Sequence, residues 1–227
     1  MRIATYNIHR TIGSDGRESP ERIVSVLNEL NADVIALQEV GYVSGEPGNL
    51  LEYLGESTQA HLIEGITFRD ERGHYGNVII SRHPVNVIKL HDISVAGREP
   101  RGAIELRLEI EDRVVQIIAT HLGLGPGERR EQVEKLVPLL AASSADIKIL
   151  LGDLNEWFLW GRPLRRLHRV FGDTPAFSTF PSRWPLFALD RIWVQPLSAI
   201  DSIHVHKSSN AKAASDHLPL IAQLYLD

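Results

Sequence analysis

Short runs of β-branched and other apolar residues recur along the chain, and each run ends in polar residues. The runs cover residues 2–6, 33–37, 77–80, 104–110, 114–119, 147–151, 192–194 and 218–226. Runs of this length between polar clusters predict β-strands. The runs 104–110 and 114–119 face each other across the pair Glu111-Asp112, which predicts a hairpin.

Three other segments have the apolar spacing of helices. Ser19 can cap a helix with Pro20 at its first position, and an apolar stripe follows at helical spacing. A second helix is predicted over residues 128–142, where Pro138 should kink the helix or end it early. A third helix is predicted to start near Pro163. Strands joined by hairpins as well as crossovers indicate an α/β protein, and a purely parallel doubly wound sheet fits this pattern poorly.

The composition limits the number of domains and the cellular compartment that can be expected. The 227 residues are 43% hydrophobic and 23% charged and contain no linker-like stretch, so one domain over residues 1–227 is expected. No run approaches the roughly 18 apolar residues of a membrane span, and the N-terminal run is interrupted by polar residues, so neither a span nor a signal peptide is expected. The absence of cysteine excludes disulfides and thiolate chemistry and fits a cytoplasmic protein. A net charge of -5 argues against an indiscriminately basic nucleic-acid binder, although a local basic face is compatible with it.

Polar residues that carry chemistry lie at the ends of the predicted strands. They are Asn7, Glu39, His121, Asp153, Asn155, Asp190, Asp216 and His217. Each residue alone fits a turn or a structural role, but strand ends converge on one edge of a sheet, where ligand sites form. The set is rich in oxygen ligands and has no thiolate, which favours a hard cation such as Mg²⁺ over Zn²⁺.

Seven segments carry a resemblance to a known family. They are Thr5-Tyr6-Asn7-Ile8-His9, Leu37-Gln38-Glu39-Val40, Gly76-Asn77-Val78-Ile79-Ile80-Ser81-Arg82, Ala119-Thr120-His121-Leu122, Gly152-Asp153-Leu154-Asn155, Leu189-Asp190-Arg191-Ile192 and Ser215-Asp216-His217-Leu218-Pro219. In this order they resemble the endonuclease/exonuclease/phosphatase superfamily, which includes deoxyribonuclease I, abasic-site endonucleases, neutral sphingomyelinases and inositol-polyphosphate 5-phosphatases. The resemblance implies a four-layer α/β/β/α sandwich, in which helices flank two packed mixed β-sheets.

The resemblance also implies a metal site. Glu39 would be the principal Mg²⁺ ligand, with Asn7 and Asp216 near the ion, and Mn²⁺ is expected to substitute for Mg²⁺. Some nuclease members carry an acidic residue two positions after the first Asn, where this chain has His9. This departure weakens the case for a second metal there and makes His9 a candidate for phosphate contact.

The catalytic roles come from the same resemblance. His217 would act with Asp190, whose carboxylate orients the imidazole, either as a base toward water or as a group that binds and polarises the phosphate. In the second case Asp153 would position or deprotonate the attacking water. Asn155 and His121 would hold phosphate oxygens in the transition state. In-line attack on a phosphoester needs charge compensation, donors aimed at oxygens and a poised nucleophile, so these roles are chemically sound.

Two further polar residues are candidates for substrate binding. Asn77 either touches the substrate or braces the site, and bracing is favoured. Arg101 can clamp a phosphate through two hydrogen bonds, and it fits a plain surface charge equally well.

The segment 157–187 combines many aromatic residues with five arginines. Its aromatic side chains either enter the core or form a lip beside the site for nucleic acid or for a membrane interface. The function expected is a Mg²⁺-dependent phosphoesterase, foremost a phosphodiesterase acting on nucleic acid or a phospholipid headgroup. The alternative is a catalytically silent phosphate- or membrane-binding module. A monomer is expected.

Overall fold

The strands of the chain form two mixed β-sheets that pack face to face. The computed structural model describes residues 1–43, 49–71 and 73–226. The strands are β1 (Arg2–Asn7), β2 (Val34–Tyr42), β3 (His61–Asp70), β4 (Gly73–Ser81), β5 (Val87–Asp92), β6 (Gly102–Ile110), β7 (Arg113–His121), β8 (Ile147–Asp153), β9 (Asp190–Gln195), β10 (Ile200–Val205) and β11 (Leu220–Leu224). A 6-stranded sheet has the order β10-β11-β1-β2-β4-β3, and a 5-stranded sheet has the order β5-β6-β7-β8-β9.

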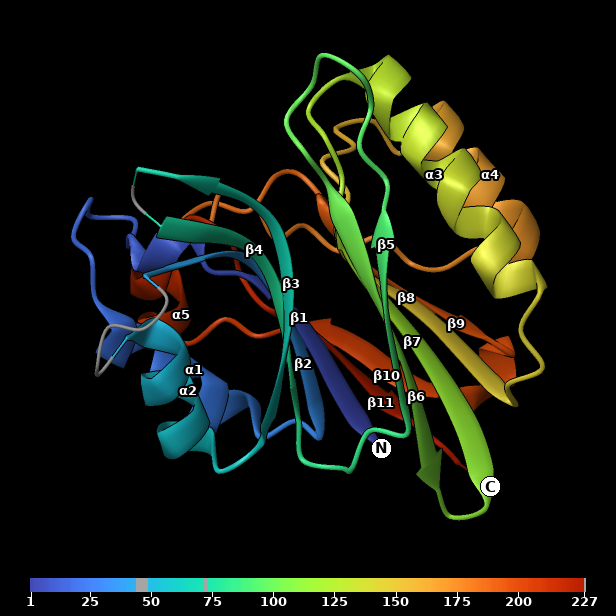
Figure 1. Cartoon of the computed structure of the whole chain (residues 1–227), viewed down its shortest axis with the longest axis horizontal. Helices are drawn as coiled ribbons and strands as arrows, with labels where there is room; N and C mark the ends of the chain where they lie inside the picture. The colour runs from blue at the N-terminus through green and yellow to red at the C-terminus, as the bar shows by residue number, and fades with distance from the viewer. Residues whose placement is uncertain (44–48, 72, 227) are drawn as a thin grey trace.

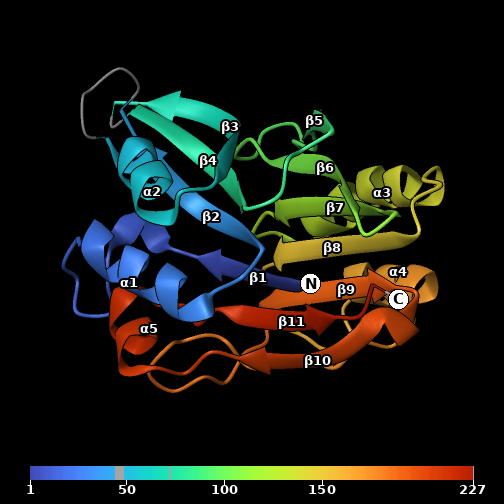
Figure 2. The ribbon, with the colours of Figure 1, turned by 90° about the horizontal axis from the view of Figure 1, so that it is seen from below.

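Helices cover the outer face of each sheet. They are α1 (Pro20–Leu30), α2 (Leu50–Thr58), α3 (Pro126–Ala141), α4 (Arg162–Phe171) and α5 (Ser209–Ala214), with short 3₁₀ turns at His9–Thr11 and Leu197–Ala199. Helices α1, α2 and α5 lie on the six-stranded sheet, and α3 and α4 lie on the five-stranded sheet (Figures 1 and 2). The four-layer α/β/β/α prediction is therefore confirmed.

Three apolar layers hold the sandwich together. The middle layer joins the two sheets through fully buried side chains such as Ile3 and Val34 on one side and Ile117 and Ile149 on the other. Separate clusters fill the spaces under α1 and α2 and under α3 and α4. Because the central strands are buried on both faces, their sequences are continuous apolar runs, which is why those strands could be predicted.

Local sequence features set several element boundaries as predicted. Ser19 caps α1, and its side chain accepts a hydrogen bond from the Arg22 backbone N–H at 3.4 Å. The β6–β7 hairpin turns at Glu111 and Asp112, whose φ angles of 52° and 63° are the left-handed values of a tight hairpin turn. Helix α3 continues past Pro138 to Ala141, so of the two effects predicted for this proline, a kink or an early end, the early end is wrong. The buried side chains of Val137 and Leu140 explain the continuation, because both pack in the layer beneath the helix.

The sequence did not predict α2, α5, β3, β5 or β10. Strands β5 and β10 lie at the edges of their sheets, and most of their residues are exposed or half-buried. Their sequences therefore lack the apolar runs by which the central strands were found. None of the helices in the described ranges is long and apolar enough to cross a membrane.

Candidate active site

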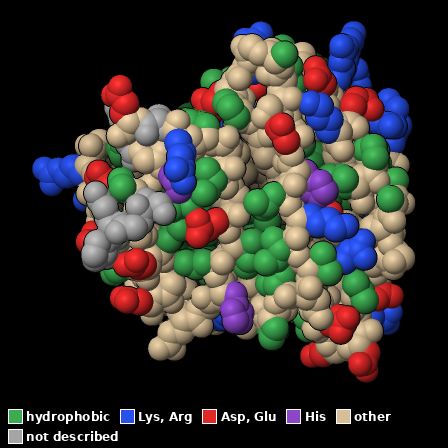
Figure 3. All heavy atoms as spheres, in the orientation of Figure 1, with side chains coloured by type: hydrophobic (Ala, Val, Ile, Leu, Met, Phe, Trp, Pro, Cys, Tyr) green, Lys and Arg blue, Asp and Glu red, His purple; other side chains and the backbone are tan. Residues whose placement is uncertain are grey.

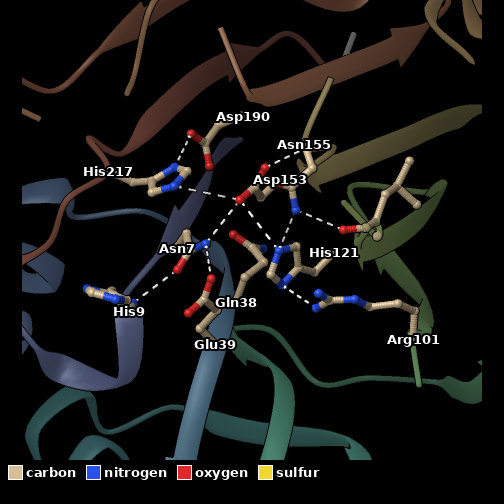
Figure 4. A network of polar contacts seen from close by, with 12 residues as sticks. Asn7, His9, Gln38, Glu39, Arg101, His121, Asp153, Asn155, Asp190 and His217 are labelled. Atoms are coloured by element: carbon tan, nitrogen blue, oxygen red, sulfur yellow. Dashed lines mark hydrogen bonds and ion pairs between the residues drawn. The ribbon is translucent and has the colours of Figure 1, made fainter. Parts of the chain in front are cut away.

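One end of the two-sheet sandwich gathers the polar residues that the sequence pattern singled out. Asn7, Glu39, His121 and Asp153 lie at or near the carboxyl ends of β1, β2, β7 and β8. Asp190 begins β9, and Asn155 and His217 lie on loops beside these strands. Figure 4 shows these side chains pointing toward one another. The site is thus assembled from both sheets.

An acidic pair of residues flanks the ring of His217. The ring Nδ1 lies 2.8 Å from Asp190 Oδ2, and the ring Nε2 lies 3.7 Å from Asp153 Oδ2. All three side chains are buried. Burial alone would lower the pKa of His217, but the negative charges of Asp190 and Asp153 outweigh it and raise the pKa to about 10. His217 is therefore an imidazolium at neutral pH, held between two carboxylates.

Asn7 connects the Asp153 carboxylate to that of Glu39. Its Nδ2 donates to Asp153 Oδ2 at 3.0 Å and to Glu39 Oε1 at 2.9 Å. Its Oδ1 accepts from the backbone N–H of His9 at 3.0 Å, which fixes the orientation of the amide. The amide thus positions two carboxylates around a single point.

A break in the β2 ladder aims Glu39 at this point. The pairing of β2 with β4 shifts register between Leu37 and Val40, and Glu39 has a φ of 58°. A left-handed conformation is unfavourable for glutamate and persists only where surrounding structure imposes it. Such irregularities at strand ends re-aim side chains at functional sites.

The Gly-Asp-Leu-Asn segment places two site residues by backbone geometry. Gly152 has a φ of 146°, and a Cβ there would lie 1.8 Å from the Thr120 backbone oxygen, so only glycine fits. Asp153 Oδ1 accepts from the Asn155 backbone N–H at 2.9 Å, which leaves Oδ2 for Asn7 and the histidines.

Both ring nitrogens of His121 face N–H donors. Arg101 Nη1 lies 3.0 Å from Nδ1, and Asn155 Nδ2 lies 2.9 Å from Nε2. Burial, opposed by Asp153 and assisted by the charge of Arg101, lowers the pKa of His121 to about 3. His121 is therefore neutral at pH 7, in contrast to His217.

Four predicted site residues lie around this centre in different settings. Arg101 is buried against His121, and its Nη2 pairs with Glu99 at 3.1 Å. Asn77 is buried and donates to the Gly102 backbone oxygen at 3.4 Å, which braces β4 against β6. His9 and Asp216 are half-buried and face each other, with His9 Nδ1 3.7 Å from Asp216 Oδ1. Asp216 has no hydrogen bond to Glu39 or Asn7 among the described residues.

Two hydroxyl residues that the sequence did not single out hold the site together. Thr179 Oγ1 donates to Asp190 Oδ2. Ser215 Oγ donates to the Asn7 backbone oxygen at 2.7 Å and accepts from the His217 backbone N–H at 3.2 Å. Ser215 adjoins the Asp-His pair and could have been found from that position, whereas nothing in the local sequence marks Thr179.

The donor set suits a hard divalent cation. Glu39 and Asp153 contribute carboxylate oxygens beside the Asn7 amide, and no ion pair joins either acid to a lysine or arginine in the described ranges. The ligand atoms of Asp153, Asp190 and His217 also lie within 4.8 Å of one another, but because His217 is protonated this cluster is an ion-paired triad and not a set of metal ligands. A site of carboxylates without a compensating Lys or Arg fits Mg²⁺ or Mn²⁺.

Comparisons with known proteins bear on the family and the fold. The sequence profile of the Endonuclease/Exonuclease/phosphatase family matches residues 4–217. The "Uncharacterized protein YbhP" of Escherichia coli K12 is 28% identical over 247 residues, covering 100% of this chain and 96% of that protein. A Bacteroides vulgatus endonuclease/exonuclease/phosphatase structure has a TM-score of 0.81 at 16% identity, covering 100% of this chain and 98% of that one. The mannosyl-6-phosphatase Bt3783 of Bacteroides thetaiotaomicron has a TM-score of 0.75 at 17% identity, with 100% of both chains covered.

Proposed function

The chain belongs to the endonuclease/exonuclease/phosphatase family, whose members hydrolyse phosphoester bonds, and from that premise we propose that it is a Mg²⁺-dependent phosphodiesterase. The observation that carries the proposal is the continuous network from Asp190 through His217 and Asp153 to Asn7 and Glu39. It places a cationic ring, a buried carboxylate and a metal-type donor set around one point. The substrate proposed is a phosphodiester of nucleic acid or of a phospholipid headgroup.

His217 and Asp153 have different roles in the proposed proton transfer. His217, held as an imidazolium by Asp190, binds a phosphate oxygen through Nε2–H and offsets charge that develops on it. Asp153 Oδ2 lies beside that ring and accepts the proton of the attacking water. His121 and Asn155, which lie at the same edge, are the groups proposed to hold the remaining phosphate oxygens.

Glu39 would be the main residue that holds the metal, with Asn7 positioning the Glu39 and Asp153 carboxylates through Nδ2 and Asp216 at the edge of the site. When bound, Mg²⁺ supplies positive charge that polarises the phosphoryl group. The bulge that directs the Glu39 side chain toward this point supports the proposed role.

The decisive test is hydrolysis of bis(p-nitrophenyl) phosphate with Mg²⁺, with Mn²⁺ and with a chelator. Turnover is expected only with a metal, and Glu39→Gln is expected to weaken apparent metal affinity by at least about 10–100-fold. His217→Asn is expected to lower kcat by about 10²–10⁴-fold. Glu109→Gln and His206→Asn, which lie outside the site, are the matched controls.

Undiminished turnover in the presence of chelator would contradict the metal assignment. Binding of inorganic phosphate without turnover of any diester would favour the catalytically silent module instead.

A further inference from the structure

Large apolar side chains project into solvent from two turns that lie against each other. We name this surface the apolar rim; its members are Trp157, Phe158, Leu159, Trp160, Trp184, Leu186 and Phe187, all exposed. The Trp157 ring lies 5.8 Å from that of Phe180 and 4.9 Å from that of Phe187, which joins the two turns. Trp184 is 79% and Leu186 is 71% exposed, values that a packed aromatic core would not give. A contiguous exposed apolar surface of this kind marks an interaction site.

The backbone holds the rim in its exposed conformation. Buried Glu156 pairs with Arg129, whose Nε lies 3.3 Å from Oε2, and its Oε1 accepts from the Phe158 backbone N–H at 3.2 Å. The second turn closes through the Leu186 N–H, which donates to the Phe180 oxygen at 2.8 Å. The exposed side chains thus stand on ordered turns.

The rim is continuous with the candidate active site. The Phe180 ring, which packs against Trp157, also lies 4.8 Å from the ring of His217. Any surface that seats on the rim is therefore brought next to the catalytic groups.

A cationic face adjoins the rim. Arg130, Arg162 and Arg165 line a hollow of about 610 Å³ together with Trp157, Phe158 and Trp160. Arg169 extends the same arginine face along α4. These four arginines are exposed and form no ion pair with any carboxylate of the described ranges, unlike Arg129 and Arg166. Figure 3 shows lysine and arginine side chains gathered at the end of the molecule that carries α3 and α4.

We propose that the apolar rim and the neighbouring arginines form a docking surface for an anionic lipid membrane. Tryptophan, phenylalanine and leucine favour the headgroup and acyl boundary, and arginine binds the anionic headgroups beside it. Leu159 and Leu186 stand at the exposed tips of the rim and have no π-face, so they do not serve base stacking, which favours lipid over single-stranded nucleic acid. A lipid phosphodiester would then be the substrate, a step that rests on the proposed hydrolase function.

Vesicle flotation with the full chain tests the docking surface. The protein is expected to float with phosphatidylcholine/phosphatidylglycerol vesicles far more than with pure phosphatidylcholine vesicles, and added salt should reduce the binding. Trp157, Trp160 and Trp184 are exposed whereas Trp193 is buried, so tryptophan emission should shift to the blue on binding.

Two sets of variants measure separately what the apolar rim and the neighbouring arginines contribute to vesicle binding. Trp184→Ser with Leu186→Ser should lower vesicle binding by about tenfold or more, because these side chains supply apolar burial. Ile88→Ser, which changes an exposed apolar residue of β5, is the matched control and should bind as the wild type does. Arg165→Gln with Arg169→Gln should remove the preference for anionic vesicles.

Three results would overturn the proposal: no binding to anionic vesicles at low ionic strength, equal loss of binding in Ile88→Ser, or binding of single-stranded DNA or RNA in place of vesicles. Thermal melting checks that each variant folds. If the rim variant fails to fold, the proposal is still tested by the unaltered chain on the two kinds of vesicle and by the arginine variant. Turnover of soluble bis(p-nitrophenyl) phosphate is measured on the unaltered chain, so failure of docking and failure of hydrolysis are read separately.

Discussion

The two buried histidines of the site hold opposite charge states, because their neighbours differ. Carboxylates on both sides raise the pKa of His217 to about 10, whereas burial and Arg101 lower the pKa of His121 to about 3. The residue types were predictable from the sequence at the strand ends. Their charge states were not, because these depend on which side chains from distant strands become neighbours.

The charge of His217 predicts a specific dependence of activity on pH. If the imidazolium binds phosphate, kcat should hold between pH 7 and 9 and fall as the pH rises through about 10, where His217 loses its proton. A rate that climbs toward pH 10 would instead identify the neutral ring as the base. The measurement is the pH profile of diester hydrolysis at saturating metal, with Asp190→Asn expected to move the loss of activity to lower pH, since a carboxylate that stabilises the charged ring is removed.

Arg101 should act on His121 in a measurable way. Arg101→Met removes a positive charge 3.0 Å from Nδ1, so the pKa of His121 should rise while burial still keeps it below its ordinary value. NMR titration of the His121 ring protons measures the change. Arg113→Met, which removes an exposed arginine on β7, should leave that titration unaltered. An unchanged His121 titration in Arg101→Met would contradict the charge argument.

At the scale of elements, the central buried strands and helices α1, α3 and α4 were predicted from the sequence, and irregular features were not. The Glu111-Asp112 hairpin and the Ser19 cap follow from local residue chemistry. The bulge at Glu39 has no such signal, because pairing with β4, not the residue itself, imposes its left-handed conformation. Tertiary packing likewise carries α3 through Pro138, against the local preference of the proline.

Pro138 therefore destabilises α3, because proline lacks the backbone N–H that would donate a hydrogen bond within the helix. Pro138→Ala restores a backbone donor inside α3 at an exposed position, and the free energy of unfolding should rise by about 1–3 kcal/mol. Urea denaturation measures this gain. Pro126→Ala serves as the control, because proline at the start of a helix is well tolerated and little change is expected there. A loss of stability in Pro138→Ala would show that the proline contributes packing that outweighs the missing hydrogen bond.

At the scale of the whole molecule, the sequence resemblance predicted the four layers, which the fold confirms, and the polar residues at the strand ends lie together at one end of the sandwich (Figure 4). For the aromatic side chains of residues 157–187, the sequence allows both burial in the core and exposure in a lip beside the site. The structure distinguishes the two for each residue. Phe171, the last residue of α4, is buried, whereas Trp157, Trp160 and Trp184 are exposed. Helical spacing places Phe171 on one face with Leu164 and Leu167, but the two turns lack a regular helical or strand pattern, so the exposure of their aromatic residues could not be predicted.

The pKa values of His217 and His121, which are shifted in opposite directions, also predict how the free energy of unfolding varies with pH. The raised pKa of His217 gives a contribution that is fully present below about pH 6.5 and is lost as the pH rises through about 10. The lowered pKa of His121 gives a contribution present above about pH 6.5 and lost as the pH falls toward 3. Melting temperature measured across pH should therefore decline on both sides of about pH 6.5. His217→Asn should flatten the alkaline side, and an unaltered alkaline decline would contradict this account.

The position of β1 has a consequence for how the protein matures in the cell. This strand lies between β2 and β11, and the Met1 amino group donates to the Leu224 oxygen at 2.9 Å. During synthesis β1 leaves the ribosome long before β11 does, so one edge of β1 stays unpaired until β11 has emerged. His217 joins Asn7 and Glu39 equally late. A nascent chain that stalls before His217 would thus lack both β11 and one member of the candidate active site, so we expect such unfinished products to be inactive.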